Sequence, residues 1–422
     1  MATTQYRSVK GMPDLLPAEA RQVRELERIA ATFFEKAGFQ ELRTPILEAA
    51  ELFSRAVGES SDIVRKEMYH LTDLGGRELV LRPEGTAPIV RAVLQHKLVA
   101  PGEAARLWYV GPMFRQENTQ KGRQRQFVQI GAEWFGAGGP WADAETIGLN
   151  VRLLEAFSVN IDAVEVNSLG NAASRLAYRE KLVGFLDKYA EQLCADCKER
   201  RQLNPLRVLD CKNQQCQAIY ADAPVPLDAL DEPSRQHFDA VCQGLETLRI
   251  EFVVNARLVR GLDYYSDTVF ELKSSRLGAQ ATVSAGGRYD SLVESFGGPP
   301  TPAVGFAAGV ERILLAREAE PAAEMTPDVV WIALDEPARR EGLGVVDQLR
   351  AGGMVALQLF HKGSVKAQMR GANQLGARFA VLCGDDERAR AVWAVRDLQQ
   401  REQFEVPATP EALIRELRAR SA

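Results

Sequence analysis

The sequence predicts a multidomain protein that combines helices and strands: an antiparallel hairpin in the first half, then a mostly helical insertion, then a small α/β domain. Two apolar runs flank a long polar loop in residues 106–136. Residues 169–248 are rich in Lys, Arg and Glu and show little strand pattern, whereas strand and helix patterns alternate after residue 329. At 422 residues the chain is also too long for a single hydrophobic core.

The composition excludes several classes of protein. With 46% hydrophobic and 26% charged residues, the chain is typical of globular proteins. Its net charge of -5 gives no overall basic character for nucleic-acid binding, although a local basic surface could serve. The sequence has no apolar N-terminal segment and no membrane-spanning run, so a cytoplasmic protein is expected, and its six cysteines should mostly be free thiols.

The N-terminal part begins with a helix over residues 18–37, whose apolar positions recur at helical spacing until Gly38 ends it. Residues 39–42 form a short strand before Pro45, which cannot donate to a sheet and belongs at an edge or interface. A loop is expected at residues 53–58.

A strand that runs into a helix is predicted next, at LVLRPEGT, residues 79–86. Glu84 and Thr86 lie at this junction, where side chains project from a sheet edge into open space. In the alternative interpretation the segment is only a helix start, with Thr86 as the cap and Glu84 favoured by the helix dipole.

The hairpin of residues 106–136 joins two strands through a polar loop that is too long for a tight turn. Arg115 lies where the first strand ends, and Arg123 and Arg125 lie where the second begins. Guanidinium groups on rigid strand ends suit a polyphosphate, because the planar group binds phosphate oxygens in pairs and keeps its charge. Alternatively, these arginines are solvated residues that protect an edge strand.

Four cysteines lie close together in the sequence of the helical insertion, which raises the question of a zinc site. Cys194 and Cys197 have the spacing of a zinc knuckle, whereas Cys211 and Cys216 are further apart than usual. Buried structural thiols or a fortuitous pairing are therefore favoured over zinc, and no metal ligand is assigned.

Two later segments carry charge in apolar surroundings. Arg260 begins a strand-like run over residues 258–272, where a charge needs a partner in the fold or a ligand. SAGGRYD, residues 284–290, is predicted as a turn. A small-residue strand enters a helix within residues 303–315, and Arg312 lies near the start of that helix. Because the helix dipole disfavours a cation there, a bound anion explains Arg312 better than the fold does.

Residues 316–325 form an Ala/Glu linker that contains a proline. Beyond it, strands and helices alternate, which predicts a small, mainly parallel α/β domain. The predicted strands are 329–333, 355–359 and 379–383, and the predicted helices are 338–350, 365–375 and 411–420. No Gly-rich dinucleotide-binding pattern follows any of these strands.

Pro45, the hairpin with Arg115 and the strand–helix unit with Arg312 resemble, in this order, the three motifs of class II aminoacyl-tRNA synthetases. The segments RPEGT, MFRQENTQKGRQRQF, VRGLDYY and AGGRYD resemble those of the histidyl-tRNA synthetase family in particular. The similarity covers nearly the whole chain, including NPLRVLDCK in the insertion and KAQMRGANQLGARFAVLCGDDE near the end.

The resemblance implies an α+β catalytic domain over residues 1–325, an antiparallel sheet flanked by helices with a helical insertion at about 170–248, and an α/β anticodon-binding domain over residues 326–422. It also implies a homodimer joined around Pro45. The implied reaction is attack of the L-histidine carboxylate on the α-phosphate of ATP, with Mg²⁺ as cofactor, and transfer of the histidyl group to the 3′ end of histidine tRNA. Such chemistry needs alignment and charge neutralisation rather than a protein nucleophile.

The resemblance assigns roles to the arginines and to a second set of polar residues. Arg115 would hold the α-phosphate of ATP, with Arg123 and Arg312 on the distal phosphates, and Arg260 would be a fixed catalytic cation. The implied histidine-binding residues are Glu84, Gly85, Thr86 and Gln129 around the amino end, Glu133 and Tyr265 on the two ring nitrogens, and Tyr264 and Tyr289 as walls.

Gln120 and Lys121 would contact the tRNA acceptor end. The chain departs from the family pattern in the same hairpin, at Asn118, Thr119, Gln124 and Val128, so further acceptor contacts are not assigned. The rival interpretation is a non-catalytic, synthetase-like regulatory subunit of ATP phosphoribosyltransferase in histidine biosynthesis. The set of four arginines and the anticodon-type domain argue against it.

Overall fold

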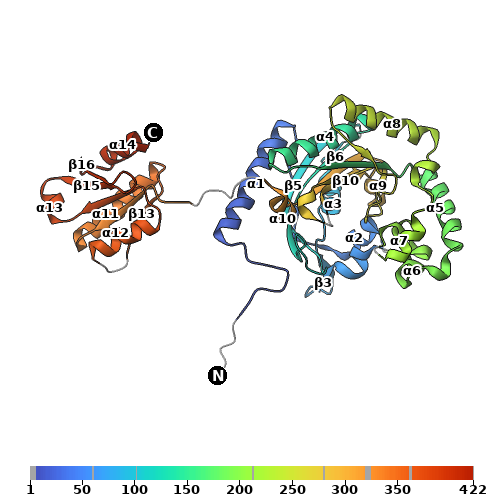
Figure 1. Cartoon of the computed structure of the whole chain (residues 1–422), viewed down its shortest axis with the longest axis horizontal. Helices are drawn as coiled ribbons and strands as arrows, with labels where there is room; N and C mark the ends of the chain where they lie inside the picture. Colours follow the sequence, from blue (N-terminus) through green and yellow to red (C-terminus); the bar gives the residue numbers. More distant parts are fainter. Residues whose placement is uncertain are drawn as a thin grey trace, which may run out of the picture. The chain divides into compact units, whose positions relative to one another are not determined.

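The computed structural model describes residues 6–58, 61–100, 102–211, 213–278, 281–318, 325–360 and 364–421. The chain divides into two compact units, residues 1–322 and 323–422 (Figure 1). Most of the linker predicted at residues 316–325 lies outside the described residues. Among the described helices, none has both the length and the apolar character needed to cross a bilayer.

The larger unit is organised around an eight-stranded sheet with the order β1-β5-β6-β11-β10-β9-β7-β8. The central strands pair antiparallel, and only the short edge strands β1 and β8 run parallel to their neighbours. In sheet order the strands are Gln40–Glu41, Ala105–Phe114, Gln126–Phe135, Ala303–Gly309, Thr282–Arg288, Ser266–Lys273, Ala163–Ser168 and Val253–Val254.

Alternation along the strands gives the sheet two apolar faces, because successive side chains point to opposite sides. On β5, Trp108 joins one buried cluster, whereas its neighbours Leu107 and Tyr109 join the other. The first face is covered by helices α1, α4, α8 and α10, which span Pro17–Lys36, Pro140–Ala156, Glu232–Thr247 and Val310–Ala316. The second face is covered by α2, Ala50–Val57, and α3, Thr86–His96.

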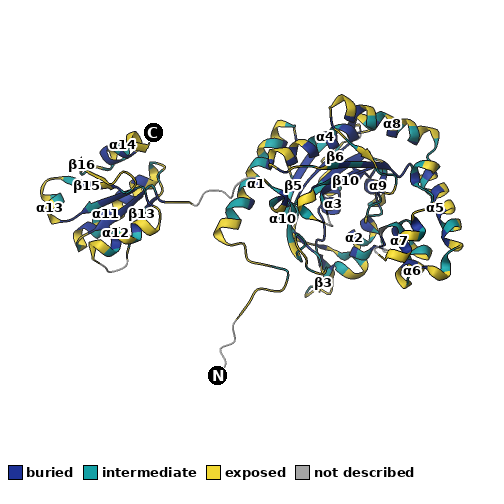
Figure 2. Ribbon diagram, in the orientation of Figure 1, coloured by how far each residue is buried: buried dark blue, intermediate teal, exposed yellow. Residues whose placement is uncertain are grey.

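Helix α1 shows how sequence pattern produces this packing. Its buried residues, Val23, Leu26, Ala30 and Phe34, recur at helical spacing, and the ring of Phe34 stacks on Trp108 with the centroids 5.3 Å apart. Figure 2 shows the same pattern across the molecule, with buried strands and helices that are exposed on one side.

A small three-stranded sheet, of order β2-β4-β3, lies in the N-terminal third of the chain. Its strands are Leu47–Ala49, Glu78–Leu81 and Tyr69–Thr72. The prediction of a loop at residues 53–58 is wrong, because α2 covers most of that segment. Phe53, Ala56 and Val57 are buried at helical spacing, so packing of this short apolar face decides the structure.

The insertion is mostly helical, as predicted, and its described part contains no strand. Before α8 it consists of α5, α6 and α7 with the short 3-10 turns η2, η3 and η4. Their bounds are Ala172–Asp187, Ala195–Leu203, Gln214–Tyr220, Ala190–Gln192, Pro205–Asp210 and Pro226–Ala229.

Two predicted segments of the larger unit differ from the structure. Most of SAGGRYD, predicted as a turn, belongs to strand β10 in the middle of the sheet, which ends at Arg288. A Cβ atom on Gly286 would lie 2.1 Å from the carbonyl oxygen of Gly305, so the glycine serves close strand packing rather than a turn. The strand-like run of residues 258–272 becomes a strand only at Ser266, and Arg260 therefore lies in a loop.

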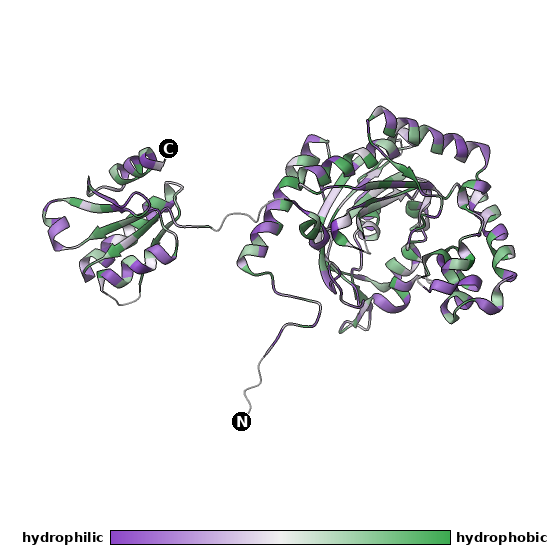
Figure 3. Ribbon diagram, viewed as in Figure 1, coloured by the Kyte–Doolittle hydropathy of each residue, from purple (hydrophilic) through white to green (hydrophobic). Residues whose placement is uncertain are grey.

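The smaller unit has a five-stranded sheet of order β13-β12-β14-β15-β16, and Figure 3 shows strongly hydrophobic strands running through it. β12 is parallel to both β13 and β14, but β14–β15 and β15–β16 are antiparallel, so "mainly parallel" was wrong for this half of the sheet. The last two strands were not predicted. The strands are Val329–Ala333, Ala356–Gln358, Phe379–Cys383, Val392–Asp397 and Glu402–Pro407, and the helices α11 to α14 are Glu336–Ala351, Val365–Gln374, Asp385–Ala389 and Pro410–Ser421.

Candidate active site

Two adjoining cavities lie over strands β6, β10 and β11 of the larger unit. The larger has a volume of about 520 Å³ and the smaller about 80 Å³. Arg115, Gln129 and Arg260 line both, so the two cavities form one continuous site.

The larger cavity brings together four arginines that are far apart in the sequence: Arg115, Arg123, Arg260 and Arg312. Arg115 follows β5 and donates its Nε hydrogen to the carbonyl oxygen of Pro83 at 2.8 Å. Arg312 lies on α10 and donates to the carbonyl oxygen of Thr282 at 2.7 Å. Hydrogen bonds to backbone carbonyl oxygens thus fix the side chains of Arg115 and Arg312 within the cavity.

Like charges face one another in this cavity. Burial, followed by repulsion from Arg123, lowers the pKa of Arg312 from its ordinary value. Arg123 is partly neutralised by Glu117, with a nitrogen–oxygen distance of 3.3 Å. An arrangement that holds neighbouring cations together favours the binding of an anion.

Arg260 is held by a carboxylate on the neighbouring strand. Its guanidinium group forms an ion pair with Glu271 of β9, and Glu271 also accepts a hydrogen bond from Thr282 Oγ1 at 2.7 Å. The cation is thereby kept at the junction of the two cavities, where it lines both.

The smaller cavity is built around Glu133, which is only 1% exposed. Its two carboxylate oxygens accept hydrogen bonds from Thr86 Oγ1, at 2.7 Å, and from the hydroxyl of Tyr289. Burial raises the pKa of Glu133 to about 8, although both hydrogen bonds act in the opposite direction. A Cβ atom on Gly305 would lie 1.8 Å from this carboxylate, so only glycine fits beside it.

Glu84 caps the helix start, which corrects the alternative in which Thr86 was the cap. The Glu84 carboxylate accepts from the backbone N–H groups of Thr86, at 2.7 Å, and Ala87, at 2.9 Å. Thr86 is the first helical residue and directs its hydroxyl to Glu133 instead. Burial raises the pKa of Glu84 as well, so two carboxyl groups share one desolvated pocket.

Three tyrosines form much of the pocket wall. The rings of Tyr264 and Tyr265 are 4.7 Å apart, and those of Tyr264 and Tyr289 are 5.6 Å apart. Burial raises the pKa of Tyr265 to about 12, so its hydroxyl keeps its proton at neutral pH. Tyr289 was expected to be a wall, yet its hydroxyl also orients Glu133.

Some of the predicted residues lie outside the cavities, and some lining residues were not predicted. Among the described residues, Gly85, Gln120 and Lys121 line neither cavity. The charged lining residues missed by sequence reasoning are Glu67, Glu117, Glu271, Lys273 and Glu311. Each is a single charge in an ordinary strand, helix or loop segment, and no local signal distinguishes it from a solvated residue.

Glu133→Gln is expected to make the protein more stable at alkaline pH. The carboxyl has a folded-state pKa of about 8 and an ordinary value of 4.5, so the wild type loses stability as the pH rises from about 4.5 through 8. Glutamine has no such titration. Between pH 6 and pH 9 the difference in unfolding free energy should change by about 2–3 kcal/mol in favour of the variant, as measured by urea denaturation. If the unfolding free energies of the two proteins change with pH in parallel, the raised pKa of Glu133 is contradicted.

Comparison with known proteins gives consistent matches over both units. Residues 11–313 match the family model described as "Histidyl-tRNA synthetase", and residues 328–420 match "Anticodon binding domain". The chain is 48% identical over 408 residues to a histidine–tRNA ligase of Parasynechococcus marenigrum, with 94% of each chain covered. It is 44% identical over 390 residues to that of Syntrophotalea carbinolica, with 92% of this chain and 93% of the other covered.

A solved structure agrees with these matches. The fold is similar to that of the apo histidyl-tRNA synthetase of S. aureus, with a TM-score of 0.82 and 32% sequence identity. The alignment covers 98% of this chain and 100% of the other.

Proposed function

The chain belongs to the histidyl-tRNA synthetase family, and from this premise we propose how the two cavities share the reaction. The activity is that of a histidine–tRNA ligase, which activates L-histidine with ATP to histidyl-adenylate and transfers the histidyl group to the 3′ end of histidine tRNA. The observation that supports our assignment is the junction of the cavities, where an arginine-lined space meets a buried carboxylate pocket.

Histidine occupies the smaller cavity in this proposal. The imidazole lies between Glu133 and Tyr265, which bind its two ring nitrogens, while Glu84, Thr86 and Gln129 surround the amino group. The support is chemical, because these polar groups line one small pocket and all of them except Gln129 are buried. Buried polar groups of this kind need a partner in the bound ligand.

ATP occupies the larger cavity. A carboxylate oxygen of histidine attacks the α-phosphorus, a new O–P bond forms, and the bond to pyrophosphate breaks. Arg115 and Arg260 neutralise the charge that develops on the α-phosphate, and Arg123 and Arg312 hold the leaving pyrophosphate. In the second step the terminal ribose hydroxyl of the tRNA attacks the histidyl carbonyl carbon, and AMP leaves.

Mg²⁺ fits the charge balance of the larger cavity. Five basic side chains and four acidic ones line it, so its own net charge is far smaller than that of a triphosphate. The carboxylates of Glu117 and Glu271 are oxygen donors of the type that Mg²⁺ accepts together with phosphate oxygens. When bound, the ion would add positive charge to the triphosphate.

The tRNA would contact both units. The loop with Gln120 and Lys121 would meet the acceptor end, and the unit that matches the anticodon-binding model would bind the anticodon. The hairpin residues Asn118 and Thr119 depart from the family pattern, so we propose no base-specific contact for them.

A homodimer and a cytoplasmic location complete the proposal. Ile46 and Leu47, beside Pro45, are 42% and 45% exposed, and Leu71 of the same small sheet is 43% exposed. Exposed apolar residues at sheet edges favour burial against a second copy. All six cysteines are unpaired, in keeping with a reducing compartment.

Two assays test the function. The purified protein should catalyse ATP–pyrophosphate exchange only with histidine, and it should charge total tRNA with histidine when each amino acid is supplied in turn. Exchange with another amino acid would overturn the substrate assignment. Histidine binding without exchange would instead indicate a regulatory protein.

A further inference from the structure

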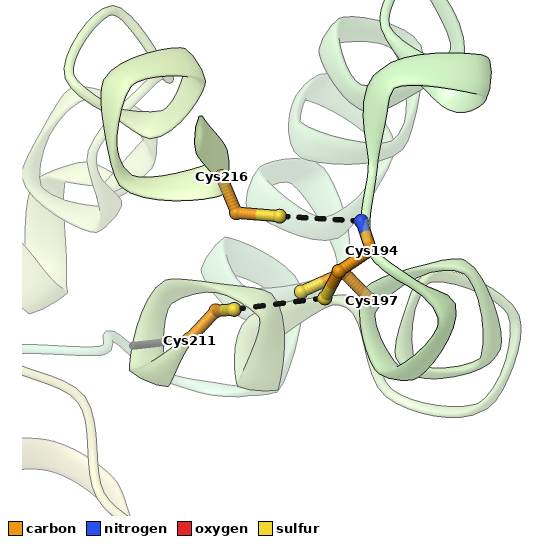
Figure 4. Close-up of side chains that lie close together, drawn as sticks. All are labelled: Cys194, Cys197, Cys211 and Cys216. Atoms are coloured by element: carbon orange, nitrogen blue, oxygen red, sulfur yellow. Dashed lines mark hydrogen bonds between the residues drawn. The ribbon is translucent and has the colours of Figure 1, made fainter. Parts of the chain in front are cut away.

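Four cysteine side chains of the insertion converge on one point (Figure 4). They come from separate segments: Cys194 and Cys197 at the start of α6, Cys211 at the end of η3, and Cys216 in α7. Their sulfur atoms all lie within 4.8 Å of one another, and those of Cys194 and Cys211 are 3.8 Å apart. Thiols that are buried only for packing have no reason to face a common centre.

The spacing of the sulfurs is that of a tetrahedral metal site. Zinc binds thiolate sulfur at about 2.3 Å, which places the corners of a sulfur tetrahedron about 3.8 Å apart. A disulfide would need two sulfurs at about 2.0 Å and would leave the other pair unexplained. We propose that Cys194, Cys197, Cys211 and Cys216 bind one Zn²⁺ ion as a structural four-thiolate site.

The surroundings of the sulfurs suit thiolates. The backbone N–H of Cys194 donates to the sulfur of Cys216 at 3.3 Å, and that of Asn213 donates to the sulfur of Cys211 at 3.4 Å. Hydrogen bonds from backbone amides to ligand sulfurs are typical of metal sites, because they stabilise the negative charge and orient the ligand.

An unsatisfied hydroxyl lies in the same cluster. Among the described residues, the buried hydroxyl oxygen of Tyr220 has no hydrogen-bond partner, and Tyr220 belongs to the same buried cluster as Cys197 and Cys216. A metal-bound thiolate accepts such a hydrogen bond far better than a thiol does.

The site is reachable from outside. Cys194 is partly exposed, whereas the other three cysteines are buried. A cavity of about 590 Å³ is lined by Cys194, Cys211, Asp62 and Asp196, so an ion has an entry path beside carboxylates.

A metal would replace apolar core that the insertion lacks. The insertion's own buried cluster has ten members, and three of them are cysteines of this site. Small units with so little apolar core usually need a disulfide or a metal. The spacing between Cys211 and Cys216 is wider than in the usual zinc pair, which argued against zinc. The fold overcomes this spacing, because α7 places Cys216 beside the other three cysteines.

The proposed site also supports the active-site loop. The chain between Cys197 and Cys211 carries Asn204 and Arg207. Asn204 Nδ2 donates to Asp263 at 2.9 Å, and Arg207 donates to Asp263 at 3.3 Å and to the carbonyl oxygen of Gly261. The metal would therefore hold in place the loop that carries Arg260.

Metal analysis of the full-length protein, purified without a histidine tag, is the first test. About one zinc per chain is expected. Chelation should lower the melting temperature, and added Zn²⁺ should restore it. Substitution with Co²⁺ should give the sulfur-to-cobalt charge-transfer bands and visible bands of a tetrahedral four-thiolate complex.

Cys194→Ser is the informative variant, because Cys194 is the least buried ligand and its loss disturbs packing least. Its zinc content should fall at least about tenfold. Cys242→Ser, a half-buried cysteine outside the cluster, is the matched control and should keep its zinc. If the variant does not fold, the cobalt spectrum and zinc titration of the wild type decide.

Three results would overturn the proposal. The first is a metal-free wild type that gives no cobalt spectrum and whose four thiols react as free cysteines. The second is a Cys194–Cys211 disulfide found by peptide mapping. The third is iron in place of zinc after purification. Equal zinc content in the Cys194 and Cys242 variants would likewise exclude these ligands.

Discussion

Phenylalanine is expected to be activated about 10⁴–10⁵-fold less efficiently than histidine, measured as kcat/KM in ATP–pyrophosphate exchange. The two side chains are of similar size, so a purely apolar pocket would separate them far less. The pocket in this protein instead has buried polar groups, and a ring without nitrogen atoms offers no partner to the carboxyl proton of Glu133 or to the hydroxyl of Tyr265.

The geometry around Glu133 explains the size of the effect. Thr86 and Tyr289 each occupy one carboxylate oxygen, which fixes the carboxyl group before any ligand enters. Its raised pKa, about 8, means that the proton is still present in most molecules at neutral pH. A ring nitrogen can accept that proton or share it, whereas a phenyl ring can do neither.

Glu133→Gln separates this explanation from simple steric fit. Glutamine keeps the shape but cannot give a proton to imidazole, so kcat/KM for histidine should fall about 10–10²-fold. Phenylalanine activation should change much less. If wild-type discrimination is below about 10²-fold, or if the variant retains full histidine activity, Glu133 does not recognise the ring.

The sequence was sufficient for features that depend on local pattern. The strand β5 has an apolar run and β6 begins with alternating polar and apolar residues, and Arg115 follows directly after β5, so both the hairpin and the position of that cation were predictable. The alternation of strands and helices likewise predicted the smaller unit as far as β14.

The features that were missed depend on contacts between distant segments. β10 looked like a turn because its glycines are needed for close packing against β11, and the local pattern does not show that these two segments pair. Glu271 is one charge in an apolar strand until the fold places Arg260 beside it. The cysteine cluster was undervalued for the same reason, since sequence spacing alone does not show where α7 places Cys216.

Arg260→Ala is expected to slow histidine activation about 10²–10³-fold while leaving the Kd for histidine largely unchanged. The guanidinium group lies where the cavities meet. In the proposed arrangement its charge would act on the reacting α-phosphate rather than on the imidazole. Single-turnover assays of histidyl-adenylate formation should show that the rate of the chemical step falls. Calorimetry without ATP should show that histidine still binds.

The removal of Arg260 has a second consequence that must be separated from the first. Glu271 loses its ion-pair partner and places a negative charge in the triphosphate cavity. The double variant Arg260→Ala/Glu271→Gln removes that repulsion, and Arg260→Lys keeps a cation without the paired donors. If the double variant regains full activity, the loss came from Glu271 alone and Arg260 is a charge-balancing residue. If it stays near the single variant while lysine recovers part of the rate, the fixed cation acts on the phosphate itself.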